Sequence, residues 1–165
     1  MIRARCLALV LLAAPMIGAA PATVGVASQA KGKARPMAEQ VATGSFEVSL
    51  QPLGAADAPI GSMSIDKRFS GGLEGRSLGQ MLAVRTAIPG SAGYVAMERV
   101  TGTLAGRQGS FALQHSGTMN NGAQALSITV VPDSGTEGLT GLTGTMEIKI
   151  EGGNHHYSFR YALPD

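Results

Sequence analysis

The sequence is poor in charged and aromatic residues, and it has no tryptophan. Charged residues make up 15% of the 165 residues and aromatic residues 4%, whereas glycine occurs 23 times. This composition excludes a typical nucleic-acid-binding surface, because such surfaces neutralise phosphates with basic stripes and stack bases on aromatic rings. Low charge with abundant glycine favours many short strands and tight turns over a helical bundle. We therefore expect one folded domain with no nucleic-acid partner.

Cysteine is almost absent, and the single Cys6 lies in an N-terminal targeting pattern. Arg3 and Arg5 precede an apolar run, and Ala20-Pro21-Ala22 then forms a small-residue cleavage motif,. The run is too short for a membrane span. We expect residues 1–22 to be a signal peptide, with cleavage as late as residue 30 as an alternative. The mature protein would be exported, periplasmic or secreted, with no disulfide and no stable membrane span.

The excess of positive over negative charge arises from the N-terminal part of the chain. From Gly44 onward the sequence contains 8 Lys and Arg against 10 Asp and Glu, although the whole chain carries a formal charge of +2. The basic segment Lys31–Arg35 falls within residues 23–43, which we expect to form a flexible linker. Residues 44–165 would then form a single domain.

The remaining sequence has the two-residue periodicity of short strands separated by turn residues. The pattern predicts eight strands, near Gly44–Gln51, Ser62–Phe69, Gly79–Thr86, Gly93–Thr103, Gly109–Thr118, Ala125–Val131, Thr145–Glu151 and His155–Leu163. Short connections favour an antiparallel meander, and closure into a barrel would remove its exposed edges. We expect an all-β, eight-stranded antiparallel up-and-down barrel, calycin-like in appearance, with a sandwich as the rival architecture. The mouth of such a barrel is a usual place for a ligand pocket.

Two residues are candidates for proton transfer. Glu98 shares a strand face with Tyr94, and the sequence leaves open whether that face points inward or outward. An inward Glu98 would need a partner, and in an apolar cavity its pKa would be raised, so that it could act as an acid or base. His115 shares a face with Phe111 and Leu113, which places it inside the barrel or at its rim. A hydrogen-bonded structural role is the alternative for His115.

Other side chains are candidates for contact with a ligand. They are Met81, Arg85, Tyr94, Phe111, His155 and Tyr157. The direction of Arg85 is ambiguous because residues 81–84 are apolar throughout. A metal site of His115, Glu98 and a C-terminal histidine is conceivable as two histidines plus a carboxylate, but the spacing does not demand it. We expect neither a metal nor a cofactor.

Several segments together resemble a bacterial family. They are Ser77–Leu82, Gly90–Glu98, Gly106–His115, Val131–Thr136, His155–Tyr157 and Tyr161–Pro164. As a set they are similar to domain of unknown function 3224, grouped with the allene oxide cyclase-like barrels. The resemblance implies an eight-stranded antiparallel barrel and no established activity. Gln80 stands where an acidic residue is expected, and Glu137 lies in a swapped Gly–Glu order, which weakens both as candidate groups.

Three functions are compatible with this sequence. The leading hypothesis is an exported barrel that binds a small apolar or amphipathic molecule in its cavity. The second is a cofactor-independent isomerase or cyclase acting in that cavity, since relatives of the barrel class include cyclases. The third is a structural or interaction barrel with a filled core. A homo-oligomer is compatible with all three, and fold alone does not choose among them.

Overall fold

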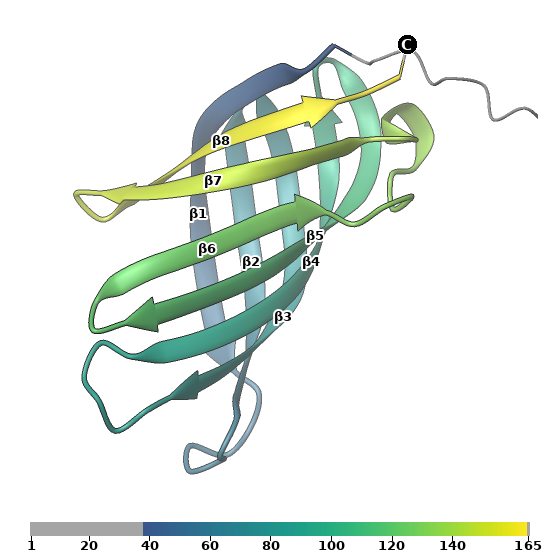
Figure 1. The fold of residues 1–165 in the computed structure, drawn as a ribbon. Coiled ribbons are helices and arrows are strands. Elements are labelled where there is room, and N and C mark those ends of the chain that lie inside the picture. The colour runs from purple at the N-terminus through teal and green to yellow at the C-terminus, as the bar shows by residue number, and fades with distance from the viewer. Residues whose placement is uncertain (1–37, 165) are drawn as a thin grey trace, which may run out of the picture. The chain divides into compact units, whose positions relative to one another are not determined.

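The protein is an eight-stranded barrel, as a computed structural model of residues 38–164 shows (Figure 1). The strands are β1 (Gln40–Pro52), β2 (Gly61–Gly71), β3 (Leu73–Arg85), β4 (Ala92–Leu104), β5 (Arg107–Asn120), β6 (Ala123–Val130), β7 (Thr143–Glu151) and β8 (Asn154–Ala162). Each strand pairs antiparallel with its neighbours in the chain, and β8 pairs with β1 to close the barrel. The expected fold class is confirmed.

Two strands, β1 and β3, begin well before the residues expected, and the other boundaries shift by at most two residues. β1 begins at Gln40, inside the segment 23–43 that the sequence indicated as a linker. β3 begins at Leu73 and not near Gly79, because its inward positions carry small residues that give no apolar alternation. At Gly75 an added Cβ would lie 2.4 Å from the backbone oxygen of Thr101, so a close approach of β4 explains the small residue,. The expected signal peptide lies outside the described residues.

One end of the barrel is filled by its own side chains. A short 3-10 helix, η1 (Glu137–Leu139), lies in the β6–β7 connection and buries Leu139 completely. The ring of Phe111 stacks on Phe159 at 5.7 Å between centroids, and both side chains are fully buried. Each such side chain contributes about 1.5–3 kcal/mol through removal from water. This packing closes the end of the barrel that carries the β4–β5 and β6–β7 connections.

A buried hydroxyl ties the C-terminal strand to the β2–β3 turn. The backbone N–H of Leu73 donates to the hydroxyl of Tyr157 at 2.8 Å. The same hydroxyl lies 3.2 Å from the carbonyl oxygen of Leu73 and 3.3 Å from that of Ser70. Gly44 makes room for this contact, since an added Cβ there would lie 2.6 Å from the hydroxyl. Tyr157 therefore holds β8 against a turn that belongs to other strands.

The pairing around the barrel is uneven. β4 and β5 pair continuously from Ala92 opposite Met119 to Leu104 opposite Arg107. β6 and β7 pair only at Thr129 and Thr145, and the two strands diverge in Figure 1. Within residues 38–164, no helix is long and apolar enough to cross a membrane.

Candidate functional site

The end of the barrel opposite η1 is hollow. It contains a cavity of about 690 Å³ that is lined by inward residues of the strands and by the β3–β4 connection. The walls are mainly apolar and include Val48, Leu50, Ile65, Met81, Ile88, Leu126, Ile148 and Ile150. The titratable side chains of the lining are Lys67, Arg85, Tyr94, His115 and His155, and its other polar residues are Thr86, Ser91, Thr118 and Gln124. The cavity therefore combines a large apolar surface with few polar groups.

The inner end of the cavity, which we call its floor, is formed by Lys67, Tyr94 and His115. A buried carboxylate with three hydrogen-bond partners lies beneath it. The ammonium of Lys67 donates to Oε1 of Glu98 at 2.8 Å, and the hydroxyl of Ser77 donates to Oε2 at 2.6 Å. Nε2 of His115 lies 2.8 Å from Oε1 of Glu98. The side chain of Glu98 is 0% exposed, while those of Lys67 and His115 are 7% and 4% exposed. The sequence left open whether Glu98 points inward. It does, and its three partners lie on three other strands.

Strand register brings these groups together. Lys67 on β2 lies opposite Ser77 on β3, and Glu98 on β4 lies opposite Gly79. An added Cβ at Gly79 would lie 2.6 Å from the Cβ of Glu98, so the glycine leaves the space that Glu98 occupies. His115 lies on the next strand, opposite Ala96. Four adjacent strands thus each supply one member of the cluster.

The carboxylate of Glu98 is charged at neutral pH. Burial alone would raise its pKa, but the hydrogen bond to His115, the charge and hydrogen bond of Lys67 and the hydrogen bond from Ser77 together lower it to about 2. The expectation of a raised pKa was therefore wrong, because it considered desolvation without the partners that β2, β3 and β5 supply. An ionised carboxylate only accepts hydrogen bonds, so Nε2 of His115 carries a proton. In the neutral ring, Nδ1 is then the acceptor.

Tyr94 places a phenol beside this cluster. It lines the cavity, and its ring lies over Gly117, where an added Cβ would be 2.2 Å from a ring carbon. Burial and the charge of Glu98 raise the pKa of Tyr94, so the phenol keeps its proton at neutral pH. Among residues 38–164, its hydroxyl has no hydrogen-bond partner. Tyr94 and His115 can therefore present a donor and an acceptor to a molecule in the cavity.

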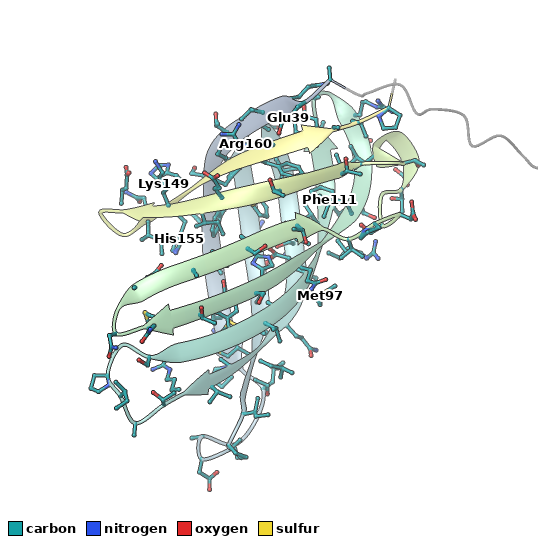
Figure 2. The ribbon with its side chains drawn as sticks, in the orientation of Figure 1. Glu39, Met97, Phe111, Lys149, His155 and Arg160 are labelled. Atoms are coloured by element: carbon teal, nitrogen blue, oxygen red, sulfur yellow. The ribbon has the colours of Figure 1, made fainter. Side chains whose placement is uncertain are left out.

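The structure brings most, but not all, of the candidate residues to the cavity. Met81, Arg85, Tyr94, His115 and His155 line it. Phe111 lies in the filled end of the barrel, and Figure 2 shows it far along the barrel from His155. Tyr157 is buried against the β2–β3 turn, and Glu98 is covered by Lys67 and His115. No group of three or more His, Cys, Asp or Glu that could hold a metal ion occurs among the residues that the structure describes.

Lys67 and Ser77 belong to the cluster, and sequence reasoning missed both. Lys67 stands between Ile65 and Phe69 on the inward face of β2. A lysine within an apolar alternation indicates an inward charge, so this signal was present in the sequence. Ser77 gave no comparable signal, because the first half of β3 alternates small residues with charged ones.

The comparisons with known proteins agree with this architecture. Residues 42–161 match the family model described as "Protein of unknown function (DUF3224)". A crystal structure of a protein with unknown function from the DUF3224 family of Shewanella oneidensis MR-1 is 49% identical in sequence. Its match covers 79% of this chain and 99% of that chain, with a TM-score of 0.72. A search of curated proteins found no match. The chain therefore belongs to the DUF3224 family, to which neither comparison assigns a function.

Proposed function

We propose that the barrel binds a small apolar or amphipathic molecule in its cavity. The observation that carries this proposal is the cavity itself, about 690 Å³ with mainly apolar walls and a polar floor. Ligand pockets commonly have volumes of about 300–1,000 Å³, with apolar linings and a few polar groups that orient the ligand. The floor of this cavity offers Tyr94 and His115 as such groups.

Apolar side chains that remain exposed inside the cavity support the proposal. Leu50, Ile88, Leu126 and Ile150 line it and are 41–62% exposed. A ligand that covered them would gain about 25 cal/mol for each Å² of apolar surface removed from water. At the η1 end, the corresponding space is filled by the protein's own side chains. This contrast favours a binding barrel over a barrel with a filled core.

Displacement of a neutral fluorescent naphthylamine from the purified protein tests the proposal. We expect Ala83→Phe, which adds a ring at the cavity wall, to weaken probe binding at least tenfold. Val84→Phe adds a ring to the outer face at the neighbouring position and is the matched control. Equal probe binding by the two variants, or no binding by the wild type, would exclude the cavity as the site.

A second function, a cofactor-independent isomerase or cyclase, is supported by the Glu98–His115 contact. A buried carboxylate that holds Nε2–H of His115 leaves Nδ1 as a base, and the protonated Tyr94 is a matching acid,. Glu98 then acts as a positioning residue, because its side chain does not reach the cavity. The resemblance of the sequence to a family that we expect to group with the allene oxide cyclase-like barrels favours the same function. Turnover that survives both His115→Gln and Tyr94→Phe would exclude this mechanism.

Export remains part of the proposal. It is supported by Arg3 and Arg5, the apolar run after them and the cleavage motif at Ala20–Ala22,. The intact mass of the protein from an exported fraction of cells tests it. A mass that begins at Thr23, or as late as residue 31, is expected. An uncleaved chain that stays in the cytosol would contradict it.

A further inference from the structure

The charged residues that line the cavity all carry the same sign. They are Lys67 and Arg85, and the other titratable side chains of the lining are His115, His155 and Tyr94. Among the residues that the structure describes, no aspartate or glutamate lines the cavity, although residues 44–165 contain 10 acidic and 8 basic residues. The nearest carboxylate, Glu98, is covered by the side chains that pair with it. A domain with an excess of acidic residues thus keeps them out of its cavity.

The two cations of the lining differ in their partners. Lys67 is paired with Glu98, and its ammonium also lies 5.0 Å from the centre of the Phe46 ring. Arg85 is exposed at the end of β3, on the inward side that Ser77 and Met81 share. Within residues 38–164 it makes no side-chain hydrogen bond and no ion pair. Arg85 is therefore the cation that the mouth of the cavity offers to a ligand.

The positions of these cations decide where an anion would bind. At the floor, an anion would lose its water beside the carboxylate of Glu98, whose charge already compensates that of Lys67,. At the mouth, a carboxylate would remain partly hydrated and could accept two parallel hydrogen bonds from the guanidinium of Arg85. The floor, in contrast, suits an uncharged oxygen, because Glu98 already compensates the charge of Lys67 there and the phenol of Tyr94 keeps a proton that it can donate.

We propose that the ligand is an anionic amphiphile, with its carboxylate on Arg85 at the mouth and a hydroxyl or carbonyl oxygen at the floor against Tyr94 and His115. This inference rests on the proposed binding function and names the class of ligand. Arg85 is four residues from Met81, which lies opposite Ala96, and Ala96 lies opposite His115. At about 3.3 Å per residue, Arg85 and the level of His115 are about 13 Å apart along the strand, and Tyr94, opposite Ala83, lies between them,. A medium-length alkyl chain spans this distance.

The inference is tested by measuring how tightly three ligands bind the wild-type protein. The ligands differ from one another in one group each. Decanoate carries the charge, decanol lacks it, and ω-hydroxydecanoate adds the distal oxygen. Each competes with the neutral naphthylamine probe at low and at high salt. We expect decanoate to bind about three- to tenfold more tightly than decanol at low salt, with a smaller preference at high salt. We expect ω-hydroxydecanoate to bind more tightly than decanoate.

Two variants, at Arg85 and Tyr94, test which side chain contacts each end of the ligand. Arg85→Gln should remove the preference for decanoate over decanol, whereas Arg160→Gln, on the outer face of β8 (Figure 2), should leave it unchanged. Tyr94→Phe should remove the gain from the distal hydroxyl without changing the preference for decanoate. Decanol binding as tightly as decanoate, or an unchanged preference in Arg85→Gln, would overturn the inference and leave the proposed function standing. Failure of the probe and all three ligands to bind would overturn the proposed function itself.

Discussion

Replacement of Glu98 by glutamine should change how the stability of the barrel depends on pH. The pKa of Glu98 is about 2 in the folded protein and 4.5 for an unperturbed glutamate. Each unit of difference corresponds to about 1.4 kcal/mol, so the ionised carboxylate contributes about 3 kcal/mol to the free energy of unfolding at neutral pH. Because the folded pKa is lowered, this contribution is present above the unfolded pKa. It is lost as the pH falls from the unfolded pKa to the folded one.

The free energy of unfolding can be measured by urea titration with far-ultraviolet circular dichroism between about pH 6 and pH 2. Glutamine cannot titrate, so the difference in stability between wild type and Glu98→Gln should shrink by about 3 kcal/mol across this range. Protonation of other carboxyls affects both proteins and cancels in the difference. Glu147→Gln, which removes an exposed carboxyl from β7, is the control variant. Parallel stability profiles for wild type and Glu98→Gln would refute the argument that Glu98 is a charged, paired group.

Three other substitutions test the packing of the barrel by the same unfolding measurement. Phe111→Ala should cost about 3–5 kcal/mol, because it opens a cavity in the filled end, and a loss below about 1 kcal/mol would contradict that packing,. Tyr157→Phe should cost about 1–3 kcal/mol, because it leaves the N–H of Leu73 without its partner, and an unchanged stability would exclude that hydrogen bond,. Gly117→Ala should cost about 1–3 kcal/mol and weaken probe binding, because its methyl group would meet the ring of Tyr94, and unchanged probe binding would contradict the position of that ring,.

Alternation within each strand predicted the barrel, because a closed sheet with one buried face imposes a period of two. The inward set of β5, with Phe111, Leu113 and His115, followed from this period alone. Turn residues between the strands indicated a meander, and a meander has few ways to bury one face. The start of β3 was missed because its inward positions hold Gly75, Ser77 and Gly79. There, close approach between backbones replaces apolar packing as the reason for the residue type.

The site was less predictable than the fold because its chemistry depends on neighbours across strands. The sequence placed Glu98 among the candidates, but its pKa depends on Lys67 and His115, which lie on other strands. Which inward residues reach the cavity depends on where the barrel is filled. Alternation places Phe111 and His155 on the same inner surface, yet one packs in the core and the other lines the cavity. Periodicity along a strand shows which residues point inward, but not whether they lie in the filled end or the hollow end of the barrel.

The single hydrogen-bonded residue pair between β6 and β7 has a consequence for how the molecule opens. By hydrogen bonding, the barrel is a curved sheet with the order β7, β8, β1, β2, β3, β4, β5, β6, whose two edges meet only at Thr129 and Thr145. A local fluctuation that separates these edges breaks only one residue pair of backbone hydrogen bonding, whereas separation of β4 from β5 breaks a continuous ladder,. Amide hydrogens on the facing edges of β6 and β7 should exchange with solvent by such small openings. Those between β4 and β5 should exchange only when the whole barrel unfolds.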